Sequence, residues 1–186
     1  MTPPAHRRTV CVAALAWGVA EATLFFIVPD VLLTRVALRD RRRALVGCGL
    51  AVLGAMLGGA VMYVWSLHDP AQVRAVLLRV PAVGPDLMTQ ADEAMRQLGG
   101  FGIVAGAFQG VPYKLFAAQA AAAGLSLPLL LAVTIPARGL RFVLTVLVAH
   151  AAAQWLRGRA GWRAVSLAWW LAWIIVYVVY WSRFGF

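Results

Sequence analysis

The sequence predicts an all-α fold: a polytopic helical membrane protein with two opposed re-entrant helical hairpins in an inverted repeat, plus crossing helices. Three observations predict it. Hydrophobic residues make up 62% of the 186 residues, with a mean hydropathy of +0.79, which exceeds the apolar share of an ordinary soluble domain. Apolar runs at 44–67, 125–150 and 164–181 reach or approach the ~20 residues that a membrane-crossing helix needs. Arginines gather at the ends of the apolar segments, as the positive-inside rule and anionic lipid headgroups require.

The first predicted element runs from 9 to 28 and ends in the stretch EATLFFIVPD. We expect Pro29 to end this helix, because proline lacks a backbone N–H and disfavours helix at the residue before it. An apolar piece at 31–38 follows. Asp30, directly after the proline, is a candidate N-cap for that piece. We therefore interpret 9–38 as a hairpin that is broken at Pro29.

The first crossing helix is predicted at 44–67. Gly54 and Gly58 lie four residues apart in it, a spacing that lets another helix approach closely. The general use of glycine in membrane helices explains the pattern nearly as well.

A more polar segment at 68–98 separates the two halves of the chain. Its last part, from 87 to 98, has apolar residues at helical spacing. We expect an amphipathic helix here that lies on the membrane surface and is ended by Gly99 and Gly100.

The second half repeats the order of predicted elements of the first half, although its amino-acid sequence differs. The apolar piece at 101–124 is interrupted by Gly110 and Pro112, and a crossing helix at 127–150 follows. A loop rich in arginine and glycine then leads to the last crossing helix, at 164–182. Paired broken segments of this kind are typical of inverted-repeat transporters, whose broken helices meet near the membrane midplane.

Loop charge favours hairpins that enter and leave the membrane on one side. Such a hairpin keeps Arg7 and Arg8 on the same side as the cluster RDRRR at 39–43, whereas a plain crossing at 9–28 separates them. The net-acidic segment then falls outside, and the arginines at 157–163 return to the cytoplasm. We expect a single membrane domain over 1–186, divided into a first hairpin and helix (9–67), the surface segment (68–98), a second hairpin and helix (99–150) and a C-terminal helix (164–182).

Five charged side chains interrupt the apolar segments and are the candidate site residues: Glu21, Asp30, Lys114, Arg138 and Arg141. Charges in hydrocarbon are costly and usually mark ion or substrate pathways. One interpretation is that the carboxylates carry protons while the bases bind an anionic headgroup. The other is that buried ion pairs fix the helices. For Arg141 alone, snorkelling toward an interface is the stronger alternative.

Other chemistry has no support in the sequence. We find no nucleophile–base pairing, metal-ligand spacing or phosphate-cradling glycine loop, and we expect no enzyme activity, metal or cofactor. The net charge of +10 lies at the ends of apolar segments, so nucleic acid is not an expected partner. Both cysteines lie in apolar sequence and are expected to be small buried hydrophobes. We interpret His150, Trp162, Tyr180 and Trp181 as interfacial residues.

Three stretches carry a resemblance to a known family. They are EATLFFIVPD (21–30), GVPYKLFAAQAAAAG (110–124) and RGLRF (138–142). The order of an early glutamate, a proline followed by an acid, a G-x-P-x-K piece and a late arginine pair resembles the DedA/VTT-domain membrane proteins, also called the SNARE-associated Golgi protein family. Within it, the chain is similar to the YqaA-like bacterial branch. The likeness covers about residues 15–150.

The resemblance implies a lipid transporter, flippase or scramblase in the bacterial inner membrane, linked in bacteria to recycling of undecaprenyl phosphate and to membrane-potential and pH homeostasis. It matches Glu21 and Asp30 to the acidic pair of the first hairpin, and Arg138 and Arg141 to the basic residues after the second. The chain lacks the family's F-x-R-x-x-P-x-x-R pattern and has VPYKLF instead, so the headgroup-binding charges differ. Membrane lipids and protons are the expected partners, and a homo-oligomer is compatible with the sequence. The alternative is a membrane assembly or homeostasis protein that transports nothing.

Overall fold

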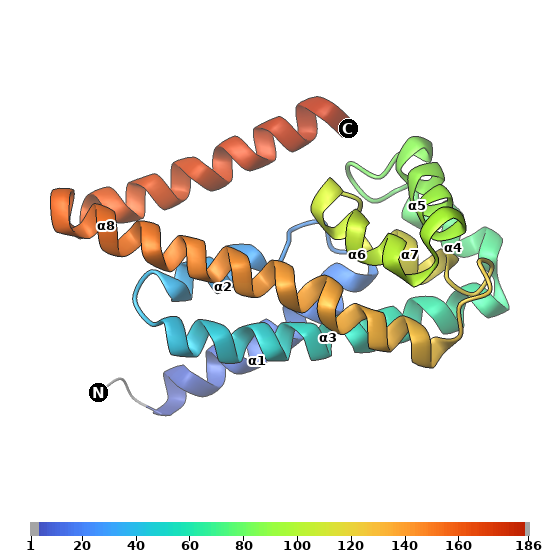
Figure 1. Cartoon of the computed structure of the whole chain (residues 1–186), viewed down its shortest axis with the longest axis horizontal. Helices are drawn as coiled ribbons and strands as arrows, with labels where there is room; N and C mark the ends of the chain where they lie inside the picture. The colour runs from blue at the N-terminus through green and yellow to red at the C-terminus, as the bar shows by residue number, and fades with distance from the viewer. Residues whose placement is uncertain (1–3, 185–186) are drawn as a thin grey trace.

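The computed structural model describes residues 4–184, and side-chain surroundings for residues 8–183. Within this range all regular secondary structure is α-helical, as predicted (Figure 1). Its helices are α1 (Pro4–Thr23), α2 (Asp30–Ala37), α3 (Arg41–His68), α4 (Pro70–Leu77), α5 (Pro85–Leu98), α6 (Gly100–Gln109), α7 (Tyr113–Gln119) and α8 (Leu127–Phe184). The side chain of Arg7 lies outside the described residues.

The first break comes earlier than the sequence predicts. Helix α1 ends at Thr23, five residues before the expected end at 28, and residues 24–29 form a non-helical connector. The Thr23 hydroxyl donates to the carbonyls of Val19 and Ala20, at 3.0 and 2.9 Å. Such side-chain bonds compete with the backbone ladder of the last turn. Pro29 therefore does not end α1. It precedes α2, a position where its fixed φ suits the start of a helix.

Helices α1 and α3 pack closely through glycine. A Cβ atom at Gly18 would meet the carbonyl of Ala51, and one at Gly54 would meet the carbonyl of Leu15. A Cβ at Gly58 would likewise meet α1 at Val19. The predicted close approach at Gly54 and Gly58 is therefore present, and its partner is α1 of the same chain.

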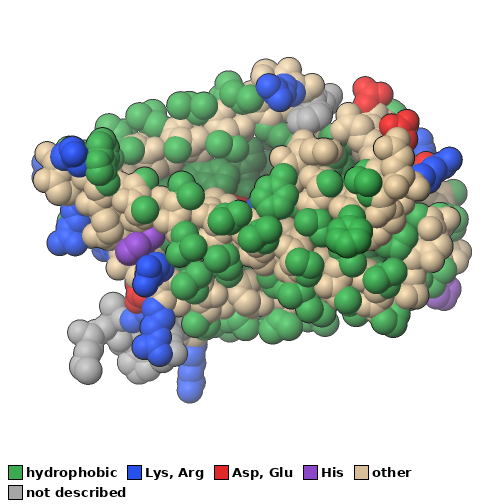
Figure 2. Space-filling model, in the orientation of Figure 1, with side chains coloured by type: hydrophobic (Ala, Val, Ile, Leu, Met, Phe, Trp, Pro, Cys, Tyr) green, Lys and Arg blue, Asp and Glu red, His purple; other side chains and the backbone are tan. Residues whose placement is uncertain are grey.

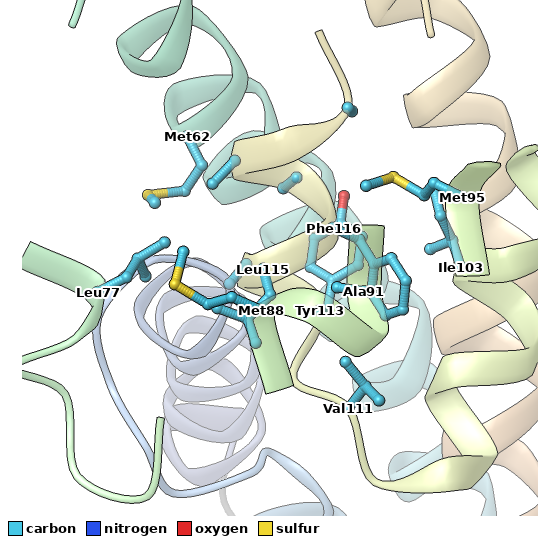
Figure 3. Close-up of a cluster of buried hydrophobic side chains, with 14 of the residues drawn as sticks. Met62, Leu77, Met88, Ala91, Met95, Ile103, Val111, Tyr113, Leu115 and Phe116 are labelled. Carbon is cyan, nitrogen blue, oxygen red and sulfur yellow. The ribbon is translucent and has the colours of Figure 1, made fainter. Parts of the chain in front are cut away.

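The polar segment forms two helices rather than one. Both α4 and α5 begin with proline in the first turn, and α5 ends at Gly99, which has a φ of +56°, as glycine at a helix end often does. The apolar face of α5 carries Leu87, Met88, Ala91 and Met95 and is buried against other helices. Figure 3 shows Met88, Ala91 and Met95 within this buried cluster. This corrects the expectation that this face lies on a membrane, because protein covers it.

The second break falls where the sequence places it. Helix α6 ends at Gln109, and Gly110 follows with a φ of +84°, a left-handed conformation that favours glycine. Pro112 is extended and precedes α7. A Cβ at Gly106 would meet the ring of Phe116, so α6 and α7 lie close together just before and after the break.

Helix α8 is longer than expected and bends once. The loop predicted at 157–163 is helical except at Gly161, which has φ +75° and ψ 179°. This conformation is essentially confined to glycine. The chain reverses there, so that residues 162–184, here called the C-terminal arm, run back over the molecule (Figure 1).

The outer surface is rich in apolar side chains (Figure 2). Among the described residues, α3 and α8 are long and apolar enough to cross a membrane. Leu57 on α3, Val148 on α8 and Val178 on the arm are all more than half exposed. A soluble monomer rarely shows contiguous apolar surface on this scale.

Candidate functional site: a charged pocket between the two helix breaks

The five charged residues predicted from the sequence line one pocket of about 410 Å³. They come from four different helices: Glu21 from α1, Asp30 from α2, Lys114 from α7, and Arg138 and Arg141 from α8. Gly110 and Pro112 also line the pocket, whereas Pro29 lies between two lining residues, Val28 and Asp30, without lining it. The molecule is hollowed between the C-terminal arm and the remaining helices (Figure 2).

Each acid forms an ion pair with one arginine of α8. Arg138 pairs with Glu21, and their side chains are 3% and 5% exposed. Arg141 donates to the Asp30 carboxylate at 2.7 Å. The three-residue spacing of the arginines places both on one face of α8, and each reaches a different partner helix. These pairs join α8 to α1 and to α2.

Lys114 contacts a backbone oxygen rather than an acid. Its Nζ donates to the carbonyl of Phe25 at 2.6 Å, and no carboxylate among the described residues lies within ion-pair distance of it. The side chain is only 2% exposed. With all five groups ionised, three cations face two carboxylates, so the pocket carries one positive charge more than its pairs neutralise.

This lysine bond joins the two helix breaks. Phe25 belongs to the connector after α1, and Lys114 is the second residue of α7, just after the break at Pro112. In Figure 1, α1 points from one end of the molecule toward its centre and α6 points toward the centre from the other. The two breaks therefore meet inside the molecule.

Side chains satisfy the backbone of the connector. Besides the carbonyl of Phe25, that of Ile27 accepts from Trp17 Nε1 at 2.8 Å. The N–H of Val28 donates to the Tyr177 hydroxyl at 3.1 Å. Away from water, backbone groups outside regular structure need such partners. The connector is thus held in a defined conformation beside the charged residues.

Aromatic rings surround the two guanidinium groups. Arg138 lies 5.4 Å from the ring centroid of Tyr113 and 5.0 Å from that of Phe142, and Arg141 lies 5.3 Å from Phe142. These are cation–π distances. Tyr113 is fixed in turn by a 2.7 Å hydrogen bond to Thr134. Arg138 is therefore positioned by two rings and a carboxylate, and Arg141 by one ring and a carboxylate.

Two donors in this cluster have no protein acceptor. Nε of Arg138 and Nε of Arg141 are buried and make no hydrogen bond within the described residues. An unsatisfied buried donor costs about 1–3 kcal/mol, and more when it is charged. Donors in excess of acceptors, together with a surplus positive charge, suit an anionic ligand that offers several oxygens.

Two expectations about individual residues need correction, and a third residue has a partner that the sequence did not suggest. Asp30 does not cap α2, because its carboxylate pairs with Arg141 and the residue lies in the first turn. Arg141 does not extend to an interface, because that same pair draws it inward. His150 bonds the carbonyl of Ala37 at 2.7 Å and so joins α8 to the end of α2.

Sequence reasoning missed the arm's contribution to the pocket. Trp173, Val176, Tyr177 and Tyr180 all line it, and Tyr180 was expected to be interfacial. The spacing of these residues repeats every three or four positions and was the available signal. It was hidden because nearly every residue of this segment is apolar or aromatic, so no face stands out.

No protein-family model, curated protein or solved structure matches the chain.

Proposed function

We propose that this protein is a multi-pass membrane protein that moves the headgroup of an anionic lipid, a lipid phosphate, across the bilayer. The observation that carries the proposal is the pocket in which three cations face two carboxylates at the meeting point of the two breaks. Charges at such a place are expensive in a membrane and are retained mainly for ion or substrate pathways.

The proposed membrane arrangement follows from the order of the helices. Helices α1 and α2 enter and leave on one side, and α6 and α7 do so on the other, as two opposed re-entrant hairpins. The lengths and hydropathies of α3 and α8 support this arrangement, as does the apolar outer surface. A headgroup would pass where the breaks meet, while its hydrocarbon chain stays outside the charged pocket.

The charges suggest how a phosphate would be held. Lys114 offers an ammonium without a carboxylate partner, and Arg138 and Arg141, each with an unsatisfied Nε donor, line the same pocket. Protonating Glu21 or Asp30 would neutralise one acid and release its arginine to the phosphate. Proton uptake and headgroup binding would then favour each other, which is the basis of the proposed proton coupling.

The likeness to the DedA/VTT-domain proteins supports undecaprenyl phosphate or a phospholipid as the lipid, and the bacterial inner membrane as the location. The second candidate function is a membrane assembly or homeostasis protein that transports nothing. The observation that favours it is that both acids already have arginine partners. Under that alternative the charges hold helices together, and Lys114 secures the connector.

Lipid translocation in proteoliposomes separates the two. We expect Lys114→Met to reduce flipping of a fluorescent lipid phosphate to the rate of protein-free vesicles, because the surplus cation is lost while both ion pairs remain. The matched control is Arg96→Met, which removes an exposed cation of α5 and should leave the rate unchanged. We also expect Glu21→Gln, Asp30→Asn and Arg138→Ala to stop flipping. Wild-type rates in a folded Lys114→Met protein would contradict the translocator.

A further inference from the structure

A second hollow lies beside the charged pocket. It has a volume of about 460 Å³ and is lined by Phe26, Ile27, Tyr177, Val178, Trp181 and Ser182. None of these side chains carries a charge. The hollow lies between the connector and the C-terminal arm, and we call it the apolar groove.

The groove and the charged pocket are adjacent. Phe26 and Tyr177 line both. The Tyr177 hydroxyl accepts the N–H of Val28, and the ring of Phe26 lies 5.9 Å from that of Trp181. These two contacts join connector and arm, so the pocket and the groove share one boundary. A molecule that is charged at one end and apolar at the other matches the pair of sites.

The arm's helical geometry explains how the two surfaces differ. Trp173, Val176 and Tyr180 face the charged pocket, whereas Val178, Trp181 and Ser182 face the groove. Tyr177 lies between the two sets. The groove also continues toward exposed apolar residues of the arm, since Val178 itself is 62% exposed. The groove is therefore open on the side where we place lipid.

We propose that the apolar groove binds a hydrocarbon chain of the same anionic lipid whose phosphate occupies the charged pocket. The inference rests on the proposed function and deepens it. It makes the ligand an intact lipid rather than a free phosphate, because a soluble anion would use the pocket and leave the groove without a role. The 460 Å³ of the groove falls within the range of small-molecule sites, roughly 300–1,000 Å³.

Photo-crosslinking of the full-length protein in phosphatidylcholine nanodiscs tests this. The probe is phosphatidic acid with a diazirine in one acyl chain, and the matched probe is phosphatidylcholine with the same chain. For each probe, mass spectrometry gives the ratio of labelling at groove residues to labelling at Ile174 and Ile175, which are exposed on the arm and do not line the groove. Inside a bilayer the acyl chain gains little from the hydrophobic effect when it enters the groove. The site at which the probe crosslinks is therefore better evidence of groove binding than the measured affinity of the lipid.

We expect the ratio to be several-fold higher for phosphatidic acid than for phosphatidylcholine. Val178→Trp, which fills the groove, should remove the difference. Val179→Trp alters the neighbouring exposed valine, which does not line the groove, and should keep it. Equal ratios for the two probes in the wild type, or equal behaviour of the two variants, would overturn the proposal that the groove binds a hydrocarbon chain.

A separate measurement keeps the headgroup site distinguishable from the groove. Calorimetry should show inorganic phosphate binding to the wild type and to Val178→Trp alike, and not to Lys114→Met. Phosphate binding without enriched groove labelling contradicts only the proposal that the groove binds a hydrocarbon chain, and it favours a soluble anion as the ligand. A wild type that binds neither inorganic phosphate nor phosphatidic acid contradicts the proposed headgroup site, and the groove proposal falls with it.

Discussion

At the scale of single residues, Glu21 and Arg138 form the most deeply buried ion pair among the described residues, with both side chains at most 5% exposed. Removing two charges from water is costly, and the pair compensates only while both partners are present. The pair between Asp92 and Arg96 on α5 differs, because Arg96 is 73% exposed. The two pairs therefore allow a buried and an exposed interaction to be compared in one molecule.

We predict that Glu21→Ala lowers the free energy of unfolding by about 3–5 kcal/mol, because it leaves the Arg138 guanidinium buried without a counter-charge. Asp92→Ala removes the acid of the exposed pair and should cost at most about 1 kcal/mol. Equilibrium unfolding of both variants in the same detergent gives the comparison. Equal losses in the two variants would mean that Arg138 finds another partner or reaches water.

The site residues were predictable because charge is rare in apolar sequence. Glu21, Lys114 and Arg138 stand out because a charged side chain in an apolar segment has a high free-energy cost in hydrocarbon. Their partners were not predictable, since pairing depends on which helices meet. Lys114 and the two late arginines were all candidate partners for the acids, yet only the arginines pair with them, and Lys114 bonds the carbonyl of Phe25. Only the fold brings that carbonyl within reach, because it belongs to a connector whose bounds the sequence misplaced.

At the scale of elements, small residues determine how α1 and α3 pack. A Cβ at Gly54 would meet backbone atoms of α1 at Leu15 and Val19, and backbone cannot move aside as a flexible side chain can. Gly49 lies on the same helix, and a Cβ there would meet nothing within 4 Å. The two glycines thus separate a packing role from the general effect of glycine in a helix.

We predict that Gly54→Ala destabilises the protein by about 1–3 kcal/mol or more, because overpacking forces α1 away from α3. Gly49→Ala should be neutral or stabilising by up to about 1 kcal/mol, since alanine favours helix over glycine. The midpoints of thermal unfolding, measured in one detergent, check both variants. A stabilised Gly54→Ala protein would show that the helices are held apart by something other than these contacts.

Helix ends were predictable where backbone geometry requires a particular residue. Gly99 and Gly110 both have positive φ, and the sequence placed helix ends at both. The end of α1 was not predictable, because Thr23 and the apolar residues after it are compatible with continued helix. The bend at Gly161 was hidden for a similar reason, since helix forms on both sides of one residue that the sequence placed in a loop.

At the scale of the whole molecule, charge is distributed unevenly along its length. The bend at Gly161 and the loop between α2 and α3 lie at one end, and α4 and α5 lie toward the other (Figure 1). Arg39 and Arg157 both lie against the ring of Trp162, at 5.3 and 5.0 Å, so the two basic segments meet at the first end. If the helices cross a membrane as proposed, basic residues at one end and a net-acidic segment at the other predict which end faces the cytoplasm.

This polarity gives the last prediction, which concerns topology. Single cysteines at Thr9, Arg42, Ala160 and Gln90, in a protein whose two native cysteines are replaced by serine, should divide into two groups. The first three belong to the basic end, and we expect a membrane-impermeant thiol reagent to label them from the cytoplasmic side. Gln90 is exposed on α5 and should be labelled from the opposite side.

The comparison of Thr9 with Arg42 decides between the two arrangements of the first forty residues. A re-entrant α1 and α2 keep both positions on one side, whereas a plain crossing by α1 puts them on opposite sides. Lipid passage through the charged pocket depends on the first result, because the breaks can open to both leaflets only if each hairpin returns to the side it entered from. Labelling of Thr9 and Arg42 from opposite sides would therefore contradict the hairpin and remove the geometric basis of the translocator, while leaving the ion pairs of Glu21 and Asp30 with a structural role.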